Sequence, residues 1–446
     1  MRTTTILKLA ICACALLILQ SCAKDKIVNS FDKTASFDSK IAHEWFALQS
    51  DLIKNTSGFS GPVAARSFGY AGITLYQAVY QGMPGYNSLE GKIEGLKPNS
   101  ITSVSDRTKY HWAAVANAAM AEFFRLQFKT TSVENLDRIN ELELYYKDIY
   151  TKLTNPDIID ASVQYGRTLA LEMNQYAISD GQSEAYSTNY PAYIPASGAG
   201  KWVPAGKEKT PLQPYWGSTR SFLTGNIVAG KTPEPPVYSE EKSSQLYKEA
   251  YELFTIRENI TTYQSDIAKF WDDATGKSSG TAGHIFFIAG TVLESQRSNL
   301  AKAAEVYCRL GIALHDACIA GWKTKFQYNT LSPVTFIRKQ IDGDFTPVLP
   351  PPPYPEYSSA HSVLAGAGFT VLSEYLGSSY SFADYSNYKR ADINGSPKNF
   401  SSFMEAAAEA GASRLYGGVN FRSSVDKGLE QGIRIGGNTS KFSLKQ

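Results

Sequence analysis

Apolar residues recur every three or four positions along most of the chain, which is the spacing of an amphipathic helix. The first such series runs over residues 37–52, from Phe37 to Leu52. Similar series predict helices over 62–79, 107–129, 133–153, 157–178, 239–256, 263–274, 282–321, 359–377, 397–417 and 423–436. Alternating strand patterns are nearly absent, so the sequence predicts an all-α protein built from helical bundles.

One long segment, residues 180–237, interrupts the helical pattern. It contains eight prolines among glycines and aromatic residues: Pro191, Pro195, Pro204, Pro211, Pro214, Pro233, Pro235 and Pro236. Proline at this density excludes a continuous helix. We expect an ordered surface loop that Trp202, Trp216 and Phe222 anchor to the helices. Loops of this length in compact domains are usually functional or flexible.

The first 22 residues have the order of a secretory signal, with Arg2 and Lys8, an apolar run and small Ser21 before Cys22. The residues before and at Cys22 resemble the lipobox of bacterial lipoproteins, in which the cysteine is acylated. We therefore predict a signal peptide over 1–21, lipidation of Cys22 and a lipidated tether over 22–36. An ordinary secreted chain remains the alternative.

Removal of this signal leaves as many basic as acidic residues, and no basic stripe suggests a nucleic-acid partner. The remaining cysteines are Cys308 and Cys318, about 15 Å apart if one helix carries both. That distance is too long for a disulfide, so we expect two buried thiols. The roughly 425 mature residues allow two packed units. We assign 37–280 to an N-terminal helical region and 281–446 to a C-terminal bundle in one continuous globule.

Candidate chemistry begins where a predicted helix starts at Ser359, Ala360 and His361. Free N–H groups and the positive end of the helix dipole favour an anion at such a position. A histidine there can also transfer a proton to or from a bound oxygen. Arg414, near the end of a later helix, would supply a fixed positive charge.

Three segments together resemble the superfamily of vanadium-dependent haloperoxidases and type 2 phosphatidic acid phosphatases. They are Lys325 to Pro333, Tyr357 to Ser362, and Ser413 to Asn420. Their order and separations match the family's three motifs, and the likeness extends over most of the mature chain. The resemblance implies two helical bundles of the haloperoxidase type, with the pocket in the C-terminal one.

The resemblance also implies a role for each matching position. Lys325 and Arg414 would bind equatorial oxygens of a phosphate or vanadate ion, while Ser359 would donate its hydroxyl and Ala360 its backbone N–H. His361 would be the general acid and base. Vanadate is the one cofactor that the resemblance implies, and we predict no other metal ligands.

Two positions depart from the family pattern. Ser332 stands where the family has a second arginine, and Asn420 stands where it has the nucleophilic or vanadium-binding histidine. Loss of a charge that stabilises the transition state costs on the order of 3 kcal/mol. The amide nitrogen of Asn420 has a delocalised lone pair and cannot form a phosphoryl adduct. Nearby Arg338 and Arg422 are expected to be structural, and so are His284 and His315.

These observations predict an exported lipoprotein of the bacterial cell envelope with an oxyanion pocket and weak or absent catalysis, so enzyme activity is left open. An active phosphatase-like or haloperoxidase enzyme with a rearranged site is one alternative. A non-catalytic interaction scaffold is another. The expected partners are phosphate, vanadate or a phosphorylated small molecule, together with the membrane that holds the lipid. The site departures argue against the first alternative, and the retained Lys325, His361 and Arg414 argue against the second.

Overall fold

The computed structural model describes residues 33–445, so the predicted signal peptide, Cys22 and most of the tether lie outside the described residues. Helices dominate this part of the chain, and the prediction of an all-α fold is confirmed. The helices are α2 (Lys40–Asn55), α3 (Gly61–Val79), α4 (Trp112–Gln127), α5 (Val133–Leu153), α6 (Pro156–Ile178), α7 (Thr224–Ala229), α8 (Gln245–Glu258), α9 (Thr262–Phe270), α10 (Gly280–Ser295), α11 (Leu300–Tyr328), α12 (Pro333–Gln340), α13 (Ala360–Leu376), α14 (Phe403–Tyr416) and α15 (Arg422–Lys441).

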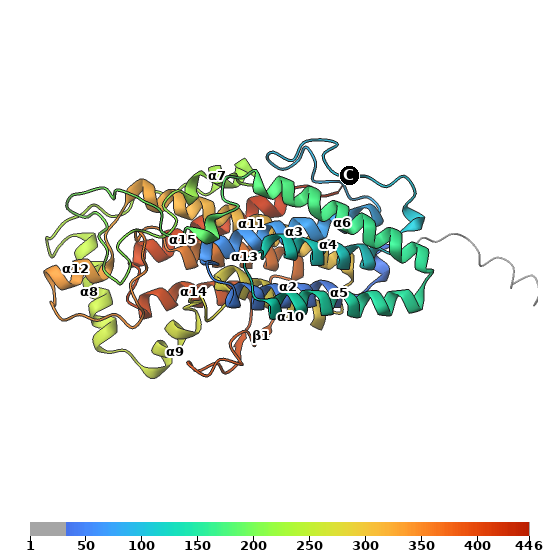
Figure 1. The fold of residues 1–446 in the computed structure, drawn as a ribbon. Coiled ribbons are helices and arrows are strands. Elements are labelled where there is room, and N and C mark those ends of the chain that lie inside the picture. Colours follow the sequence, from blue (N-terminus) through green and yellow to red (C-terminus); the bar gives the residue numbers. More distant parts are fainter. Residues whose placement is uncertain (1–32, 446) are drawn as a thin grey trace, which may run out of the picture.

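The molecule is elongated, with α3, α11 and α13 running through its middle (Figure 1). Helices α4, α5 and α6 lie toward one end, and α8, α12 and α14 lie toward the other. One large apolar core extends from α4, α5 and α6 to α14, and a smaller one joins α8 and α12. No helix within residues 33–445 combines the length and the apolar character needed to cross a bilayer.

Two pairs of helices approach so closely that glycine is required at the contact. On α3, a methyl group at Gly72 would overlap the carbonyl oxygen of Tyr307 on α11. On α15, a methyl group at Gly432 would overlap the carbonyl oxygen of Val363 on α13. Because α13 carries His361 at its first turn, the second contact also fixes where that histidine lies.

The structure corrects several of the predicted helix boundaries. The run predicted over 282–321 is two helices, because Arg297 has a left-handed backbone and Asn299 caps α11. Residues 398–400 form strand β2 (Lys398–Phe400), which pairs antiparallel with β1 (Phe382–Asp384), so α14 begins only at Phe403. Helix α8 begins at Gln245 after its cap Ser244, and α4 begins at Trp112.

The proline-rich segment 180–237 carries one short α-helix, α7, and two single-turn 3-10 helices, Ala185–Ser187 and Trp216–Ser218. Trp202, Trp216 and Phe222 are each at most 1% exposed, which confirms their predicted role as anchors. The backbone N–H groups of Phe222 and Leu223 donate to the buried carboxylate of Asp316 on α11. Cys308 and Cys318 are free and buried, as predicted.

Candidate functional site

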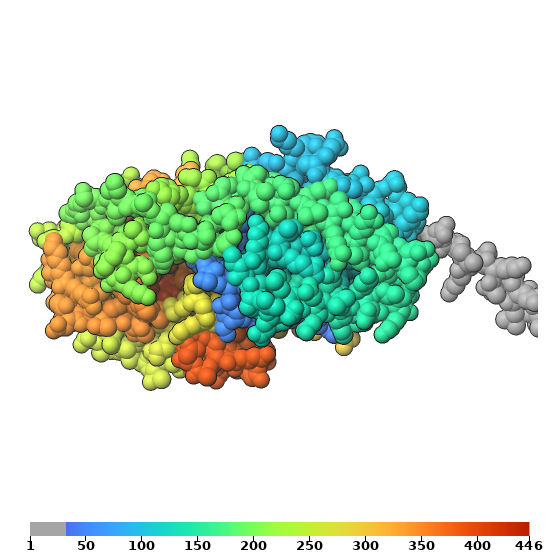
Figure 2. Space-filling view, viewed as in Figure 1, coloured from blue at the N-terminus to red at the C-terminus, as the bar shows by residue number. Residues whose placement is uncertain are grey.

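A cavity of about 380 Å³ opens where the start of α13 meets the end of α14. Its wall also includes residues 272–275 after α9, the start of α3 and the proline run 350–353. Figure 2 shows a hollow between the green loop and the yellow and orange segments, with red atoms of the C-terminal part at its base. Segments far apart in the sequence therefore enclose this space together.

Four of the predicted site positions line this cavity: Ala360, His361, Arg414 and Asn420. Ser359 lies directly behind them, fully buried as the N-cap of α13, where its hydroxyl accepts hydrogen bonds from the backbone and side chain of Ser362. Lys325 and Ser332 are buried but do not line the cavity.

Arg414 presents a buried guanidinium with unused donors. Nη1 donates to the carbonyl of Trp271 at 3.1 Å, and Nη2 lies 3.8 Å from Oδ1 of Asp272. Nε has no hydrogen-bond partner within residues 33–445. The residue is only 2% exposed, and burial lowers the pKa of Arg414, an effect that Asp272 opposes. A guanidinium stays protonated in proteins, so Arg414 is a fixed cation, and its Nε has no acceptor within the described residues.

His361 is held as a neutral imidazole of one tautomer. Its Nε2 lies 3.1 Å from the backbone oxygen of Asp272, and a carbonyl can only accept. Nε2 therefore carries the proton, which leaves the lone pair on Nδ1. Burial, reinforced by the positive charge of Arg414, lowers the pKa of His361 to about 3. At neutral pH this side chain is an acceptor and a candidate base, but it is not an acid.

Lys325 uses its ammonium to organise the chain just before α13. Nζ donates to the carbonyl oxygens of Pro355, Glu356 and Ser358 at 3.0, 2.9 and 2.6 Å. An ammonium has three N–H groups, so all of them are engaged. Burial lowers the pKa of Lys325 and raises the pKa of Glu356. Direct contact between Lys325 and an anion would require the release of at least one carbonyl.

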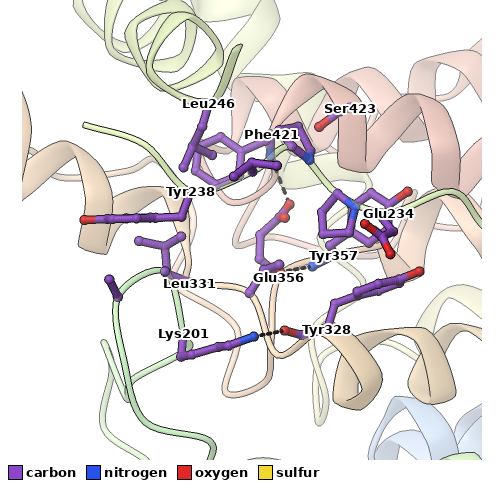
Figure 3. A pocket seen from close by; sticks show the side chains of 16 residues that line it. Lys201, Glu234, Tyr238, Leu246, Tyr328, Leu331, Glu356, Tyr357, Phe421 and Ser423 are labelled. Carbon is purple, nitrogen blue, oxygen red and sulfur yellow. Dashed lines mark hydrogen bonds between the residues drawn. The ribbon is translucent and has the colours of Figure 1, made fainter. Parts of the chain in front are cut away.

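Glu356 and Asn420 form a wall between this cavity and a second one. The amide nitrogen of Asn420 donates to Oε1 of Glu356 at 2.8 Å, and the N–H of Phe421 donates to the same oxygen at 3.0 Å. Figure 3 shows the second cavity, of about 280 Å³, with the Glu356 carboxylate pointing to the backbone of Phe421. Asn420 is thus fixed by a carboxylate.

Two carboxylates that sequence reasoning missed, Asp272 and Asp273, also line the cavity. Oδ1 of Asp273 lies 3.0 Å from Nδ1 of His284, whereas its Oδ2 has no hydrogen-bond partner within residues 33–445. Burial alone would raise the pKa of Asp273, but the neighbouring charge of His284 lowers it. The adjacent acids after Trp271 were a visible signal, but only folding places them beside Arg414.

The remaining candidates lie away from the cavity. His284 on α10 is buried between Asp273 and Asp384, and its Nε2 also lies 2.7 Å from the hydroxyl of Ser386. Burial alone would lower the pKa of His284, but the two carboxylates outweigh it and raise the pKa to about 10. The buried His315 has a pKa lowered to about 4, chiefly by burial.

The arginines near the two departures are engaged elsewhere. Arg338 donates to the carbonyl of Phe345, and Arg422 forms an ion pair with Glu252 at 2.6 Å. Ser332 stands at the N-cap position of α12 without a side-chain capping bond, and its hydroxyl lies 2.9 Å from that of Thr335. Neither arginine lines the cavity, so the described structure places no substitute there for the guanidinium absent at Ser332.

A family model described as the VCPO second helical-bundle domain matches residues 305–446. This range includes Lys325, His361, Arg414 and Asn420, and it lies within the predicted C-terminal region 281–446. The boundary of that region stays a prediction. No curated protein sequence matches the chain.

Solved structures match nearly the whole chain. The structure described as the first bacterial vanadium-dependent iodoperoxidase has a TM-score of 0.82 and 28% identity, over 92% of this chain and 98% of that chain. The holo form of a bacterial vanadium-dependent chloroperoxidase has a TM-score of 0.63 and 15% identity, over 89% of this chain and 94% of that chain. The apo form of a bacterial vanadium-dependent chloroperoxidase has a TM-score of 0.62 and 14% identity, over 86% of this chain and 93% of that chain. The likeness to the chloroperoxidases is one of fold alone.

Proposed function

Because the chain belongs to the vanadium haloperoxidase and type 2 phosphatidic acid phosphatase superfamily, we propose that its cavity binds a phosphate-like oxyanion with weak or absent turnover. The observation that carries this proposal is Arg414. Its guanidinium is buried and lines the cavity, and its Nε has no acceptor among residues 33–445. A charged donor left unpaired in the interior is costly, so an anion that accepts from it is stabilised.

The first turn of α13 supports the same ligand from the other side. Ala360 and His361 line the cavity at the N-terminal end of a 17-residue helix. Backbone N–H groups there lack partners within the helix and carry the positive end of its dipole. The anion would lie between this helix end and Arg414.

Vanadate does not fit this site as a resident cofactor. Asn420 stands where the resemblance places the nitrogen ligand, and its amide nitrogen donates to Glu356. We therefore assign no reaction step to vanadate in this chain.

Weak turnover is expected from the chemistry of the side chains that are present. The neutral His361 can accept a proton but has none to give at Nδ1, and Asn420 cannot attack phosphorus. The cavity also lacks a second arginine among its described residues. Each of these groups would act on the transition state. Because they would act together, the losses of rate that follow from their absence do not add.

The test is calorimetric titration of the purified protein with inorganic phosphate in a phosphate-free buffer. We expect saturable binding to the parent and a loss of about tenfold or more in Arg414→Gln, because a charge-assisted hydrogen bond is removed. Arg422→Gln is the matched control, since Arg422 pairs with Glu252 outside the cavity.

The outcomes separate the competing functions. Absence of phosphate binding in the parent would contradict the oxyanion proposal and favour an interaction scaffold. Hydrolysis of a generic phosphomonoester at roughly 1 per second or faster would instead favour an active enzyme with a rearranged site. The export of the protein and its attachment to the envelope through Cys22 are part of the same proposal and rest on the sequence.

A further inference from the structure

The cavity carries acceptors as well as the cation that would hold the oxyanion. Its ionisable side chains include one fixed cation, Arg414, and two carboxylates, Asp272 and Asp273. His361 adds no charge at neutral pH because its pKa is lowered to about 3. Lys325 is engaged with three backbone carbonyls and does not line the cavity. His284 lies against Asp273, but it is shared with Asp384 and does not line the cavity either. A phosphate dianion alone would therefore meet an excess of negative charge.

Asp273 is built to stay ionised. It is 7% exposed, and His284, itself held between Asp273 and Asp384, lies against its Oδ1. This leaves Oδ2 without a short hydrogen bond in the described part of the chain, although the side chain of Thr281 is close enough to help lower the pKa of Asp273. The interior location makes such an unpaired oxygen costly, so a donor brought by a ligand would be stabilised.

Asp272 adds a second carboxylate that is more accessible. Its side chain is 28% exposed, and its nearest cationic partner is Nη2 of Arg414 at 3.8 Å. That distance is longer than a hydrogen bond, so the carboxylate keeps accepting capacity. Nδ1 of His361, the nitrogen that keeps the lone pair, is a further acceptor on a side chain that lines the same cavity.

We infer that the ligand of this cavity is a small phosphorylated amine, with its oxyanion on Arg414 and its ammonium group on Asp272 and Asp273. This inference rests on the proposed oxyanion function and names the class of ligand for the same site. An ammonium is favoured over a hydroxyl because it neutralises the excess carboxylate as well as donating to it. The cavity of about 380 Å³ is large enough for such a molecule.

The test compares ligands that differ in one group. Phosphoethanolamine and ethyl phosphate share the phosphomonoester, but only the first has an ammonium group. Titration calorimetry of the full-length protein should show phosphoethanolamine binding about tenfold or more tightly than ethyl phosphate, as expected for a hydrogen bond between charged groups. Glycerol 1-phosphate, which offers hydroxyls without charge, should bind like ethyl phosphate.

Two aspartate variants separate the site from the fold. Asp272→Asn keeps the shape of the side chain and breaks no short hydrogen bond of the carboxylate, so the protein should fold. It should reduce the preference for phosphoethanolamine severalfold while ethyl phosphate binds as well as before or better. Asp137→Asn, at an exposed position on α5, is the matched control and should preserve the preference. Asp273→Asn should have the larger effect if it folds.

Each result has one meaning. Equal affinities for phosphoethanolamine and ethyl phosphate would overturn this inference while leaving the oxyanion proposal in place. Equal affinities for phosphoethanolamine and glycerol 1-phosphate would show a hydroxyl-binding site and would also overturn it. An unchanged preference in Asp272→Asn would overturn the assignment of Asp272 as an ammonium acceptor. Failure of all three esters and of inorganic phosphate to bind would overturn both proposals.

Discussion

Lys325 binds the backbone before α13, whereas the resemblance implies that it binds the anion directly. The resemblance places it on the anion, yet its ammonium donates to three backbone carbonyls in the segment that leads into α13. Those bonds hold residues 355–358 in position and thereby fix Ser359 and His361. Its influence on the ligand would then be indirect, through the placement of the helix end.

This arrangement predicts a large effect of Lys325 on stability. Lys325→Met keeps the length of the side chain but leaves three carbonyls without their shared donor, which should lower the free energy of unfolding by about 3 kcal/mol. Urea denaturation measures this loss. Lys323→Met, at an exposed position on the same helix, is the control and should change stability little. Unchanged stability together with lost phosphate binding would instead support direct contact with the anion.

The sequence predicted part of the site because motif residues near one helix end necessarily lie close together. Ala360 and His361 are adjacent at the start of α13. Arg414 lies in the last turn of α14, and Asn420 lies just beyond the end of that helix. Asp272 and Asp273 could not be placed in the same way. Their approach to Arg414 depends on the left-handed backbone of Asp273 and on contacts about 140 residues apart, as in the bond from Arg414 to Trp271.

At the level of elements, His284 joins three parts of the chain. It lies on α10, Asp273 follows α9, and Asp384 is the last residue of β1. The indole ring of Trp271 stacks on the imidazole at 4.5 Å between centroids. A charged histidine between two buried carboxylates satisfies both, so this cluster fixes the segment that carries the cavity's acidic residues.

The cluster predicts how stability depends on pH. The folded pKa of His284, about 10, is above the ordinary value of 6.5, so its contribution is fully present below pH 6.5 and is lost as the pH rises through about 10. The loss would amount to roughly 5 kcal/mol at most. The unfolding free energy of the parent should fall across this window, and that of His284→Gln should fall less.

A direct measurement avoids dependence on the variant's folding. The imidazole carbon-bound proton signals of His284 in NMR should stay those of a cation from pH 5 to pH 9. Signals that titrate near pH 6.5 would show that the two carboxylates do not hold the proton, and the charge tally of the cavity would then have to be revised.

Element boundaries were predictable where local signals and packing agree. Helix α5 matches its predicted range, and Ser132 caps it by accepting from the N–H of Asn135. The sequence predicted one helix where α10 and α11 lie. Both helices are apolar on most faces, so the spacing of apolar residues does not reveal where the first ends and the second begins. The break lies at Arg297, whose left-handed backbone has no signature in the sequence.

For the molecule as a whole, the fold and the site carry separate information. The chain follows a bacterial iodoperoxidase over nearly its full length with a TM-score of 0.82. The cavity nevertheless combines Asn420 with two carboxylates, which favours binding of a mixed-charge ligand over vanadium chemistry. A shared fold therefore supports ancestry, and the activity has to be argued from the side chains.

The last prediction concerns where the whole molecule resides. The sequence predicts a tether over 22–36 between a lipid on Cys22 and the first helix. Acylation would hold the protein on an envelope membrane, because buried acyl chains supply the binding energy that the folded surface need not provide. Cys22→Ser should therefore move the protein from the membrane fraction to the soluble fraction after cell lysis, with its phosphate binding unchanged. Ser21→Ala, which keeps a small residue before the cysteine, should leave the protein with the membrane. A Cys22→Ser variant that sediments with the membrane as the parent does would show that another part of the chain is responsible.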